Sequence, residues 1–348
     1  MKKLLSVLLV MALAVSCLAG CGSGSSKKIG VAMPTKSLQR WNQDGDNMKK
    51  ELEAAGFEVD LQYADDSIET QISQIENMIN SGCKCLVIAS IDGSTLGTVL
   101  AKAKEKNIPV IAYDRLLMDS DAVSYYATFD NELVGTIQGQ YIEEKLNLKS
   151  GAGPFNIEII TGDPGDNNAR FFYKGAMDVL NPYIDNGQLV VKSGQKDFDV
   201  VATANWDSAN AQNRFDQLIS AYYSDGTNLD AVMASNDSTA IGVATSLAAN
   251  YKGTYPIITG QDCDITAVQN MIAGKQAMSI FKDTRTLAKQ TVKMVTAILN
   301  GTAVETNNTY DNNKIQVPSY LCAPVFADID NYKSLLIDSC YYTEDQLK

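Results

Sequence analysis

The stretch Val110–Arg115, with the sequence VIAYDR, decides the fold class of this chain. An apolar, β-branched run that ends in charged side chains is typical of a buried parallel strand, which presents polar groups at its carboxyl edge. Asp114 accepts hydrogen bonds and Arg115 carries five N–H donors in a fixed geometry, so the pair suits a ligand rich in hydroxyls, such as a sugar. An Asp–Arg ion pair that closes a loop is the alternative.

Strand and helix patterns alternate along the chain on both sides of this stretch. Upstream, strands are expected at 29–33, 57–61 and 85–89, with helical patterns at 68–79 and 94–106 among others. After a strand at 125–129 the alternation restarts and continues to a helix at 285–299. This order predicts parallel, doubly wound α/β sheets. Two similar blocks in about 320 residues fit two lobes better than one large core.

The amino terminus has the pattern of an export signal. Lys2 and Lys3 precede an apolar run that is too short to span a bilayer, and Leu18-Ala-Gly-Cys21 resembles a bacterial lipobox. We therefore expect a lipoprotein signal peptide at 1–20, a lipid on Cys21, and a flexible tether over 21–27. These features predict a protein anchored by lipid on the extracytoplasmic face of the cell membrane, or on the periplasmic side.

Composition excludes several classes of function. The formal charge is −12, and it becomes −14 when residues 1–20, which contain two lysines, are removed. An acidic chain argues against nucleic-acid binding. The sequence has no histidine, so Ser–His and Cys–His catalysis and the commonest metal ligand are absent. We expect no catalytic residues, no cofactor and no metal site.

The cysteines do not form a complete disulfide pattern. Cys17 and Cys21 belong to the amino-terminal segment, which leaves an odd number, namely Cys83, Cys85, Cys263, Cys322 and Cys340. Cys83 and Cys85 enter an apolar run with the wrong spacing for a zinc knuckle. We interpret them as small buried hydrophobes, with metal or redox chemistry as the alternative.

The polar residues that follow the predicted strands are the candidate site, because ligands bind at the carboxyl ends of parallel strands. Besides Asp114 and Arg115, these positions hold Arg40 and Trp41, residues 163–168, Asn236 and Asp237, Gln261 and Asp262, and Lys282. A mixture of acids, bases and amides suits a polyhydroxyl ligand better than a phosphate, for which a Gly-rich loop with a lysine would be expected.

The sequence has two tryptophans, Trp41 and Trp206, one in each predicted lobe. Both lie in polar contexts. A flat indole can cover the C–H face of a pyranose, so one ring from each lobe would enclose a sugar. Two tryptophans in the protein core are the alternative.

The chain resembles the type I bacterial sugar-binding proteins of ABC importers, and among them the xylose-binding and multiple-monosaccharide-binding members. The resemblance covers nearly the whole chain after the leader. It rests on these segments: Ser37–Trp41, Gln71–Ile79, Ala112–Arg115, Asp166–Ala169, Ser235–Asp237, Gly260–Asp262 and Phe281–Thr284.

The resemblance implies two Rossmann-like lobes joined by three hinge crossings, which close over one sugar. We place lobe 1 at 28–128 and 280–314, and lobe 2 at 129–279 and 315–348. The residues implied to bind the sugar are Arg40, Trp41, Asp114, Arg115, Asn168, Trp206, Asn236, Asp262 and Lys282. Asn167 is the alternative to Asn168, and Arg170 is expected on a solvated face.

The resemblance implies a monomeric receptor that binds a monosaccharide of the xylose, arabinose, glucose or galactose type and delivers it to an ABC permease and its ATPase. A sensory receptor for a sugar or a signalling molecule, acting on a chemoreceptor or a sensor kinase, is the alternative. A glycosidase using Asp114 and Asp262 and a transcriptional regulator of the same fold are less consistent with the motifs, the leader and the charge.

Overall fold

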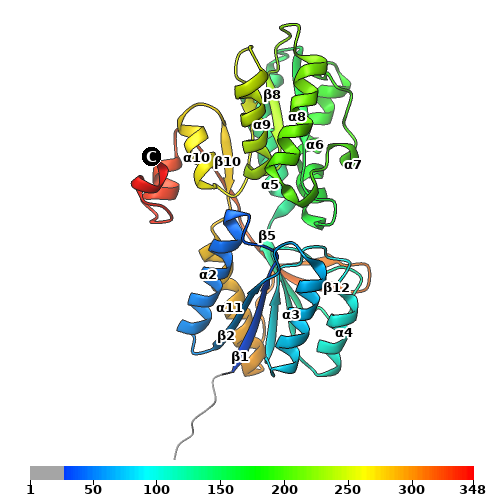
Figure 1. The fold of residues 1–348 in the computed structure, drawn as a ribbon, viewed down its shortest axis with the longest axis vertical. Coiled ribbons are helices and arrows are strands. Elements are labelled where there is room, and N and C mark those ends of the chain that lie inside the picture. The colour runs from blue at the N-terminus through cyan, green and yellow to red at the C-terminus, as the bar shows by residue number, and fades with distance from the viewer. Residues whose placement is uncertain (1–26) are drawn as a thin grey trace, which may run out of the picture.

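The computed structural model describes residues 27–348, which form two α/β lobes stacked end to end (Figure 1). The predicted signal peptide, the lipid attachment at Cys21 and nearly all of the predicted tether lie outside the described residues. Within the described part, no helix is both long and apolar enough to cross a membrane.

The first lobe contains seven strands and four α-helices. Its strands are β1 (Lys28–Met33), β2 (Glu58–Tyr63), β3 (Cys85–Ile88), β4 (Val110–Tyr113), β5 (Tyr125–Phe129), β11 (Asn308–Asp311) and β12 (Gln316–Cys322). Its helices are α2 (Gln39–Ala54), α3 (Ile68–Asn80), α4 (Gly97–Glu105) and α11 (Thr284–Asn300). The strand order is β11-β12-β5-β4-β3-β1-β2, and all pairs are parallel except β11 with β12.

The second lobe has a sheet of parallel strands in the order β7-β6-β8-β9. Its elements are α5 (Asn131–Lys145), β6 (Phe155–Ile160), α6 (Asn167–Asp185), β7 (Leu189–Val191), α7 (Phe198–Val201), α8 (Ser208–Tyr222), β8 (Ala231–Ala234), α9 (Asp237–Asn250), β9 (Ile257–Ile258) and α10 (Ile265–Ile272). Beyond β9, Gln261 forms a parallel bridge to β10 (Met278–Phe281), which pairs antiparallel with β13 (Val325–Asp328). The predicted doubly wound α/β class is thus confirmed.

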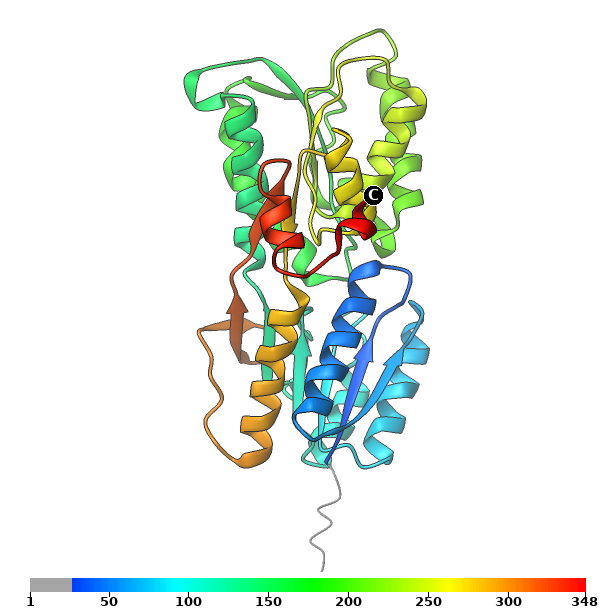
Figure 2. The same cartoon turned by 90° about the vertical axis from the view of Figure 1, so that its left-hand side faces the viewer.

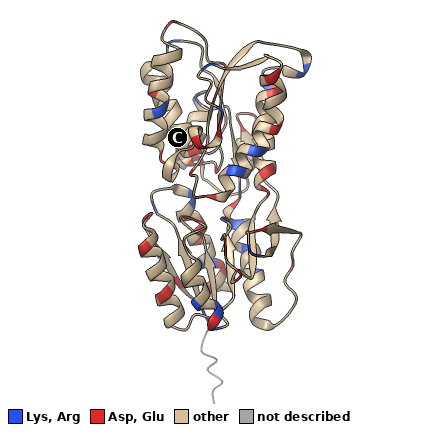
Figure 3. Cartoon of the chain, turned by 90° about the vertical axis from the view of Figure 1, so that its right-hand side faces the viewer, with Lys and Arg blue, Asp and Glu red and all other residues tan. Residues whose placement is uncertain are grey.

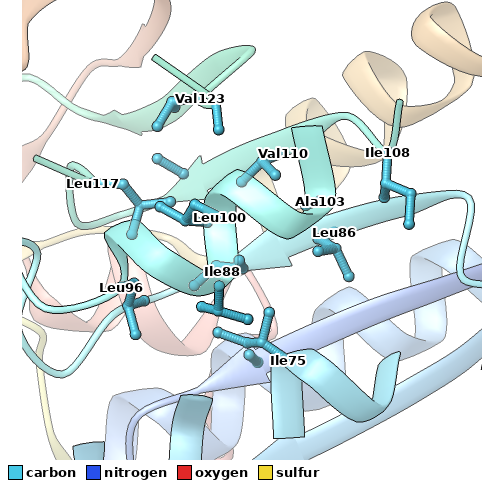
Figure 4. Close-up of a cluster of buried hydrophobic side chains, with 14 of the residues drawn as sticks. Ile75, Leu86, Ile88, Leu96, Leu100, Ala103, Ile108, Val110, Leu117 and Val123 are labelled. Carbon is cyan, nitrogen blue, oxygen red and sulfur yellow. The ribbon is translucent and has the colours of Figure 1, made fainter. Parts of the chain in front are cut away.

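Local sequence signals explain why these elements form where they do. The Ser67 hydroxyl accepts a hydrogen bond from the Thr70 N–H at the start of α3. Ile75 of α3 is buried against Leu86 and Ile88 of β3, in the cluster that Figure 4 shows. Burial of each such side chain contributes about 1.5–3 kcal/mol, so the covering helices are fixed firmly to the sheet.

The chain crosses between the lobes three times, as the family resemblance implied: after β5, between β10 and α11, and between β12 and β13. The predicted boundary at residue 315 is wrong. Ser319 and Leu321 of β12 pair with β5 in the sheet of the first lobe, so this crossing lies at residues 323–324. The reason is a long-range pairing that local sequence pattern does not reveal.

Charged residues of both signs are spread over the two lobes. In the view of Figure 3, Lys and Arg positions, coloured blue, are interspersed with Asp and Glu positions, coloured red, on the helices of each lobe. Paired surface lysines such as Lys174, which contacts Glu132 and Asp178 at 2.7 Å, illustrate this mixing.

Candidate functional site

A cavity of about 380 Å³ lies between the lobes, at the carboxyl ends of their strands. Its lining comes from both lobes and from one crossing: Leu38, Arg40, Trp41, Asp114, Arg115, Asp166, Phe172, Trp206, Asn236, Gln261, Asp262, Asp264 and Lys282. This volume includes space that is open to solvent. Residues of both lobes line the cavity and form ion pairs across it, so the lobes are in a closed arrangement.

Arg40, in the first turn of α2, connects the carboxylates of the site. One of its terminal nitrogens, Nη2, lies 2.8 Å from Asp44 Oδ2 and 2.9 Å from Asp114 Oδ2. The other, Nη1, lies 3.3 Å from Asp262 Oδ1 in the second lobe. Buried charges are stable only when they are paired, so this guanidinium links the two lobes through their acids.

Lys282 lies in the crossing between β10 and α11 and is 2% exposed. Its Nζ is 3.3 Å from Asp262 Oδ1 and 3.7 Å from Asp114 Oδ2. The two acids and the two bases thus form a buried network in which each carboxylate contacts both cations.

Arg115 extends from the end of β4 to the second lobe. Its Nε lies 3.0 Å from Asp166 Oδ2, while its Nη1 donates to the backbone oxygens of Ser90 and Ile91 at 2.9 and 3.1 Å. The guanidinium is fixed on three sides. It therefore forms a rigid part of the cavity wall and makes a second ionic contact between the lobes.

The backbone at several of these residues adopts the left-handed region. Asp114, Trp206 and Asp262 have φ values of 56°, 55° and 97°. Non-glycine residues adopt such angles infrequently, and when they do they are often found at functional sites. The strain turns the chain sharply at the end of the strand or loop and directs each side chain into the cavity.

The backbone oxygen of Asp114 accepts three hydrogen bonds. The donors are the Tyr126 hydroxyl at 2.6 Å, the Thr128 hydroxyl at 2.8 Å and the Asn168 amide nitrogen at 2.7 Å. Asn168 also accepts from Tyr126 at 3.0 Å. These bonds hold the strained turn in place and tie α6 of the second lobe to it.

Aromatic rings cover two sides of the cavity. Trp41 is covered by the guanidinium groups of Arg40 and Arg115, at 4.4 and 5.0 Å from the ring. Trp206 packs edge to face on Phe172, with 6.2 Å between ring centroids. Both tryptophans are also packed in hydrophobic clusters of their lobes. Each tryptophan therefore belongs to the core of its lobe and also lines the cavity. That the two rings enclose a sugar stays a prediction.

Five buried polar atoms of the lining lack a hydrogen-bond partner within residues 27–348. Three are donors, Nε1 of Trp41 and of Trp206 and Nε of Arg115, whose contact with Asp166 is ionic. Two are acceptors, Gln261 Oε1 and Asp264 Oδ1. Leaving a buried polar group unpaired costs about 1–3 kcal/mol, so these atoms are suited to a ligand that both donates and accepts.

The carboxylates of the site differ in their protonation. For Asp114, burial alone would raise the pKa, but Arg40, Lys282 and Arg115 together outweigh it and lower the pKa. Burial, followed by repulsion from Asp262, raises the pKa of Asp264 to about 7. Asp114 is thus held ionised, which does not suit it to act as the general acid of a glycosidase.

Eight of the nine predicted site residues line the cavity, and Asn168 does not. Asn168 is 1% exposed, and its side chain donates to the backbone oxygen of Asp114 and accepts from the Tyr126 hydroxyl. Asn167 is half-buried. Arg170 is exposed and pairs with Asp199 at 3.3 Å, as expected for a solvated face.

Five lining residues are not among the nine that the resemblance implies: Leu38, Asp166, Phe172, Gln261 and Asp264. Asp166 and Gln261 follow strands, so the rule for strand ends had already made both of them candidates. Leu38 and Phe172 are apolar and resemble ordinary core positions. Asp264 precedes α10 at the N-cap position, where the sequence suggests a helix cap, but its side chain makes no capping hydrogen bond.

The cysteines of the described chain are all free thiols. Cys83, Cys85, Cys263 and Cys322 are buried and Cys340 is exposed. Burial raises the pKa of Cys85 to about 12, so this thiol is unreactive. The interpretation of Cys83 and Cys85 as buried hydrophobes is confirmed. Among the described residues no group of three or more His, Cys, Asp or Glu side chains is arranged to hold a metal ion.

The two lobes, the three crossings and a closed interlobe cavity define a two-lobed solute-binding receptor. The family model described as "Periplasmic binding protein domain" matches residues 29–303, and the chain belongs to this family. It has the type I periplasmic binding protein fold.

Several known proteins are similar over nearly the whole chain. The multiple sugar-binding periplasmic receptor ChvE of Rhizobium radiobacter is 51% identical, with 100% of both chains covered. The D-xylose-binding periplasmic protein of Escherichia coli strain K12 is 35% identical over 92% of each chain. A crystal structure of an ABC transporter solute-binding protein from Clostridium phytofermentans with bound β-D-glucose is 69% identical, covers 92% of this chain and 100% of that one, and superposes with a TM-score of 0.92.

Proposed function

We propose that this protein is an extracytoplasmic receptor that binds a monosaccharide in the pyranose form between its lobes and delivers it to an ABC sugar importer. The observation that carries this proposal is the set of five unpaired atoms in the cavity wall, three donors and two acceptors. Sugar hydroxyls both donate and accept, so one molecule satisfies both kinds. The glucose bound to the 69% identical protein supports a hexose as ligand.

The charged network would hold the ring hydroxyls. Asp114 and Asp262 accept from neighbouring hydroxyls, while Arg40, Arg115 and Lys282 donate to the same oxygens. Trp41 from one lobe and Trp206 from the other would cover the faces of the ring. Because these groups belong to both lobes, a bound sugar favours the closed state by contacts that the open state lacks.

Xylose, arabinose, glucose and galactose are the candidate ligands. They differ at one substituent or one epimeric centre, and a site that loses one hydroxyl partner discriminates by about 1–3 kcal/mol. The names of the relatives, which mention multiple sugars and D-xylose, favour a receptor that accepts several of them.

We further propose that the mature protein is a monomer held at the membrane by a lipid on Cys21, and that the permease and its ATPase recognise the closed lobes. The alternative role is sensory, because a chemoreceptor or sensor kinase would recognise the same closed surface. The 51% identical relative is described as a receptor, and this description supports the sensory role as an alternative. Genes for a permease and an ATPase beside this one would favour transport.

A thermal-shift and calorimetry screen of residues 27–348 tests the proposal. The ligands are xylose, arabinose, glucose, galactose, ribose and a disaccharide. A sugar at 100 to 1,000 times its Kd should stabilise the protein by about 2.7–4.1 kcal/mol, which raises Tm by several degrees. A shift confined to a few pyranoses supports the proposal, whereas no shift with any sugar overturns it. Release of product from aryl glycosides would instead indicate a glycosidase.

A further inference from the structure

A second set of contacts between the lobes lies outside the cavity. The carboxyl-terminal segment, residues 329–348, packs on α10 of the second lobe and reaches the amino-terminal end of α2 in the first (Figure 2). None of its residues lines the cavity. Its contacts with the first lobe are therefore independent of what the cavity holds.

Tyr342 is the centre of these contacts. Its ring is 4% exposed and packs in a cluster with Val268, Met271 and Leu336 of the second lobe. Its hydroxyl donates to the Cys263 backbone oxygen at 2.9 Å, in the same lobe. The ring is thus anchored on one lobe, and the free lone pairs of the hydroxyl face the other.

Two glutamines of α2 donate to that hydroxyl. Gln39 Nε2 lies 2.6 Å from it and Gln43 Nε2 lies 2.9 Å from it. The neighbouring Tyr341 donates to Gln43 Oε1 at 3.1 Å. Three hydrogen bonds therefore join the segment to the helix whose next residues, Arg40 and Trp41, line the cavity.

Gln39 also caps a helix of the opposite lobe. Its Oε1 accepts from the Ile265 backbone N–H, at the first residue of α10, at 3.1 Å. Asp264 occupies the N-cap position of that helix, yet its side chain makes no capping hydrogen bond and lines the cavity instead. A free N-terminal N–H is normally satisfied by the cap residue itself. Here the first lobe supplies the acceptor.

We propose that Gln39 and Tyr342 form a latch that holds the lobes closed and sets how long a ligand stays bound. The proposal rests on the proposed function, because the latch acts on a ligand enclosed between the lobes. Neither residue lines the cavity, so both act by positioning the lobes and not by contact with the ligand. The latch contributes equally whichever ligand is bound, unlike the cavity residues, which distinguish one ligand from another.

The test compares Tyr342→Phe, Gln39→Ala and the double variant with the wild type. Tyr342→Phe removes the hydroxyl that accepts from Gln39 and Gln43. Gln39→Ala removes the amide that donates to Tyr342 and the oxygen that accepts from the Ile265 N–H. Each single variant should weaken the binding of glucose and of xylose by the same factor, about tenfold. The dissociation rate should rise by that factor and the association rate should stay unchanged.

The double variant distinguishes a latch from general damage. Because both single variants lose the hydrogen bond between Gln39 and Tyr342, the double variant should weaken binding by less than the product of the two single losses. The matched control is Tyr332→Phe, in the same segment, whose hydroxyl has no hydrogen-bond partner among the described residues. It should bind like the wild type. Losses that multiply, or that differ between the two sugars, overturn the proposal.

A readout that needs no ligand separates this proposal from the proposed function. Fluorescent labels on one exposed position of each lobe, in a Cys340→Ser background, report the fraction of closed molecules. Tyr342→Phe should lower that fraction in the ligand-free protein. An unchanged fraction overturns the latch. If the wild type binds no sugar while the fraction still falls, the proposed function fails and the latch stands.

Discussion

The two halves of the cavity are built differently. In the first lobe, Arg40 is paired with Asp44 and Asp114 of the same lobe, and Asp44 also accepts from the Tyr113 hydroxyl. In the second lobe, Asp262 has cationic partners only in the other lobe and in the crossing. Three of the five unpaired polar atoms belong to the second lobe, on Trp206, Gln261 and Asp264, and two belong to the first, on Trp41 and Arg115.

This difference indicates an order of events. The first half keeps its ion pairs when the lobes separate, so it is organised before the ligand arrives. The second half gains its partners when the lobes close on a ligand. Pre-organisation reduces the cost of the first contact, and the unpaired groups of the second half make closure dependent on the ligand.

The substitution Asp114→Asn should have the largest effect. It removes a carboxylate that contacts both Arg40 and Lys282, and breaking a buried charge pair on one side costs about 3–5 kcal/mol. Asparagine tolerates the left-handed backbone at this position. Affinity for the preferred sugar, measured by calorimetry, should fall at least about a hundredfold. Asp185→Asn, at an exposed acid, is the control, and equal affinities for the two variants would contradict the pre-organised half.

Gly162→Ala should have the next largest effect on sugar affinity. It should change only the half of the cavity that the second lobe forms. A Cβ at this position would lie 1.9 Å from the Trp206 ring, which must then move. Forcing an extra methyl group into a packed site costs about 1–3 kcal/mol, so affinity should fall about tenfold to a hundredfold. Gly97→Ala is the control, since a Cβ there meets no atom within 4 Å. Tryptophan fluorescence of the variant should change as well; unchanged affinity and fluorescence would show that the ring is not a wall of the site.

The smallest effect is a dependence of stability on pH in the second half. The pKa of Asp264 is about 7 in the folded protein and near 3.8 when unfolded. Between these values the folded state holds a proton that the unfolded state has lost, so the free energy of unfolding falls as pH rises and levels off above about 7. Asp237, whose pKa is also raised, acts in the same direction.

Melting curves of the sugar-loaded protein at pH 5, 6, 7 and 8 test this dependence. The Tm of the wild type relative to Asp264→Asn should decrease by a few degrees from pH 5 to pH 7. Asp114, with its lowered pKa, adds no change in this range, because it loses its stabilising charge only as pH falls below about 4. Parallel curves for the two proteins would contradict the assignment of the proton to Asp264.

The sequence predicted the fold class well because both lobes repeat one strong local pattern. Buried strands such as β3 and β4 are short apolar runs, and caps such as Ser67 mark where helices begin. The same rule that ligands bind at carboxyl ends of parallel strands located most of the cavity. Local patterns fail where pairing is long-range, which is why β12 was assigned to the wrong lobe.

The site residues that were missed show a second limit. Phe172 lies in a helix with ordinary amphipathic spacing, so nothing in the sequence distinguishes a ring that faces the cavity from one that faces the core. Asn168 shows the opposite case, because a residue from a family motif proved to bind the backbone of Asp114 rather than the cavity. Whether a side chain faces the cavity or the core depends on how both lobes pack, and local sequence does not contain this information.

The position of β12 determines when this protein can finish folding. The strand lies between β5 and β11, and its partner Tyr126 precedes Ser319 by almost two hundred residues. During synthesis the first lobe is therefore left with an open sheet edge until nearly the whole chain has emerged. Long-range closure of this kind makes folding slow and exposes strand edges to aggregation.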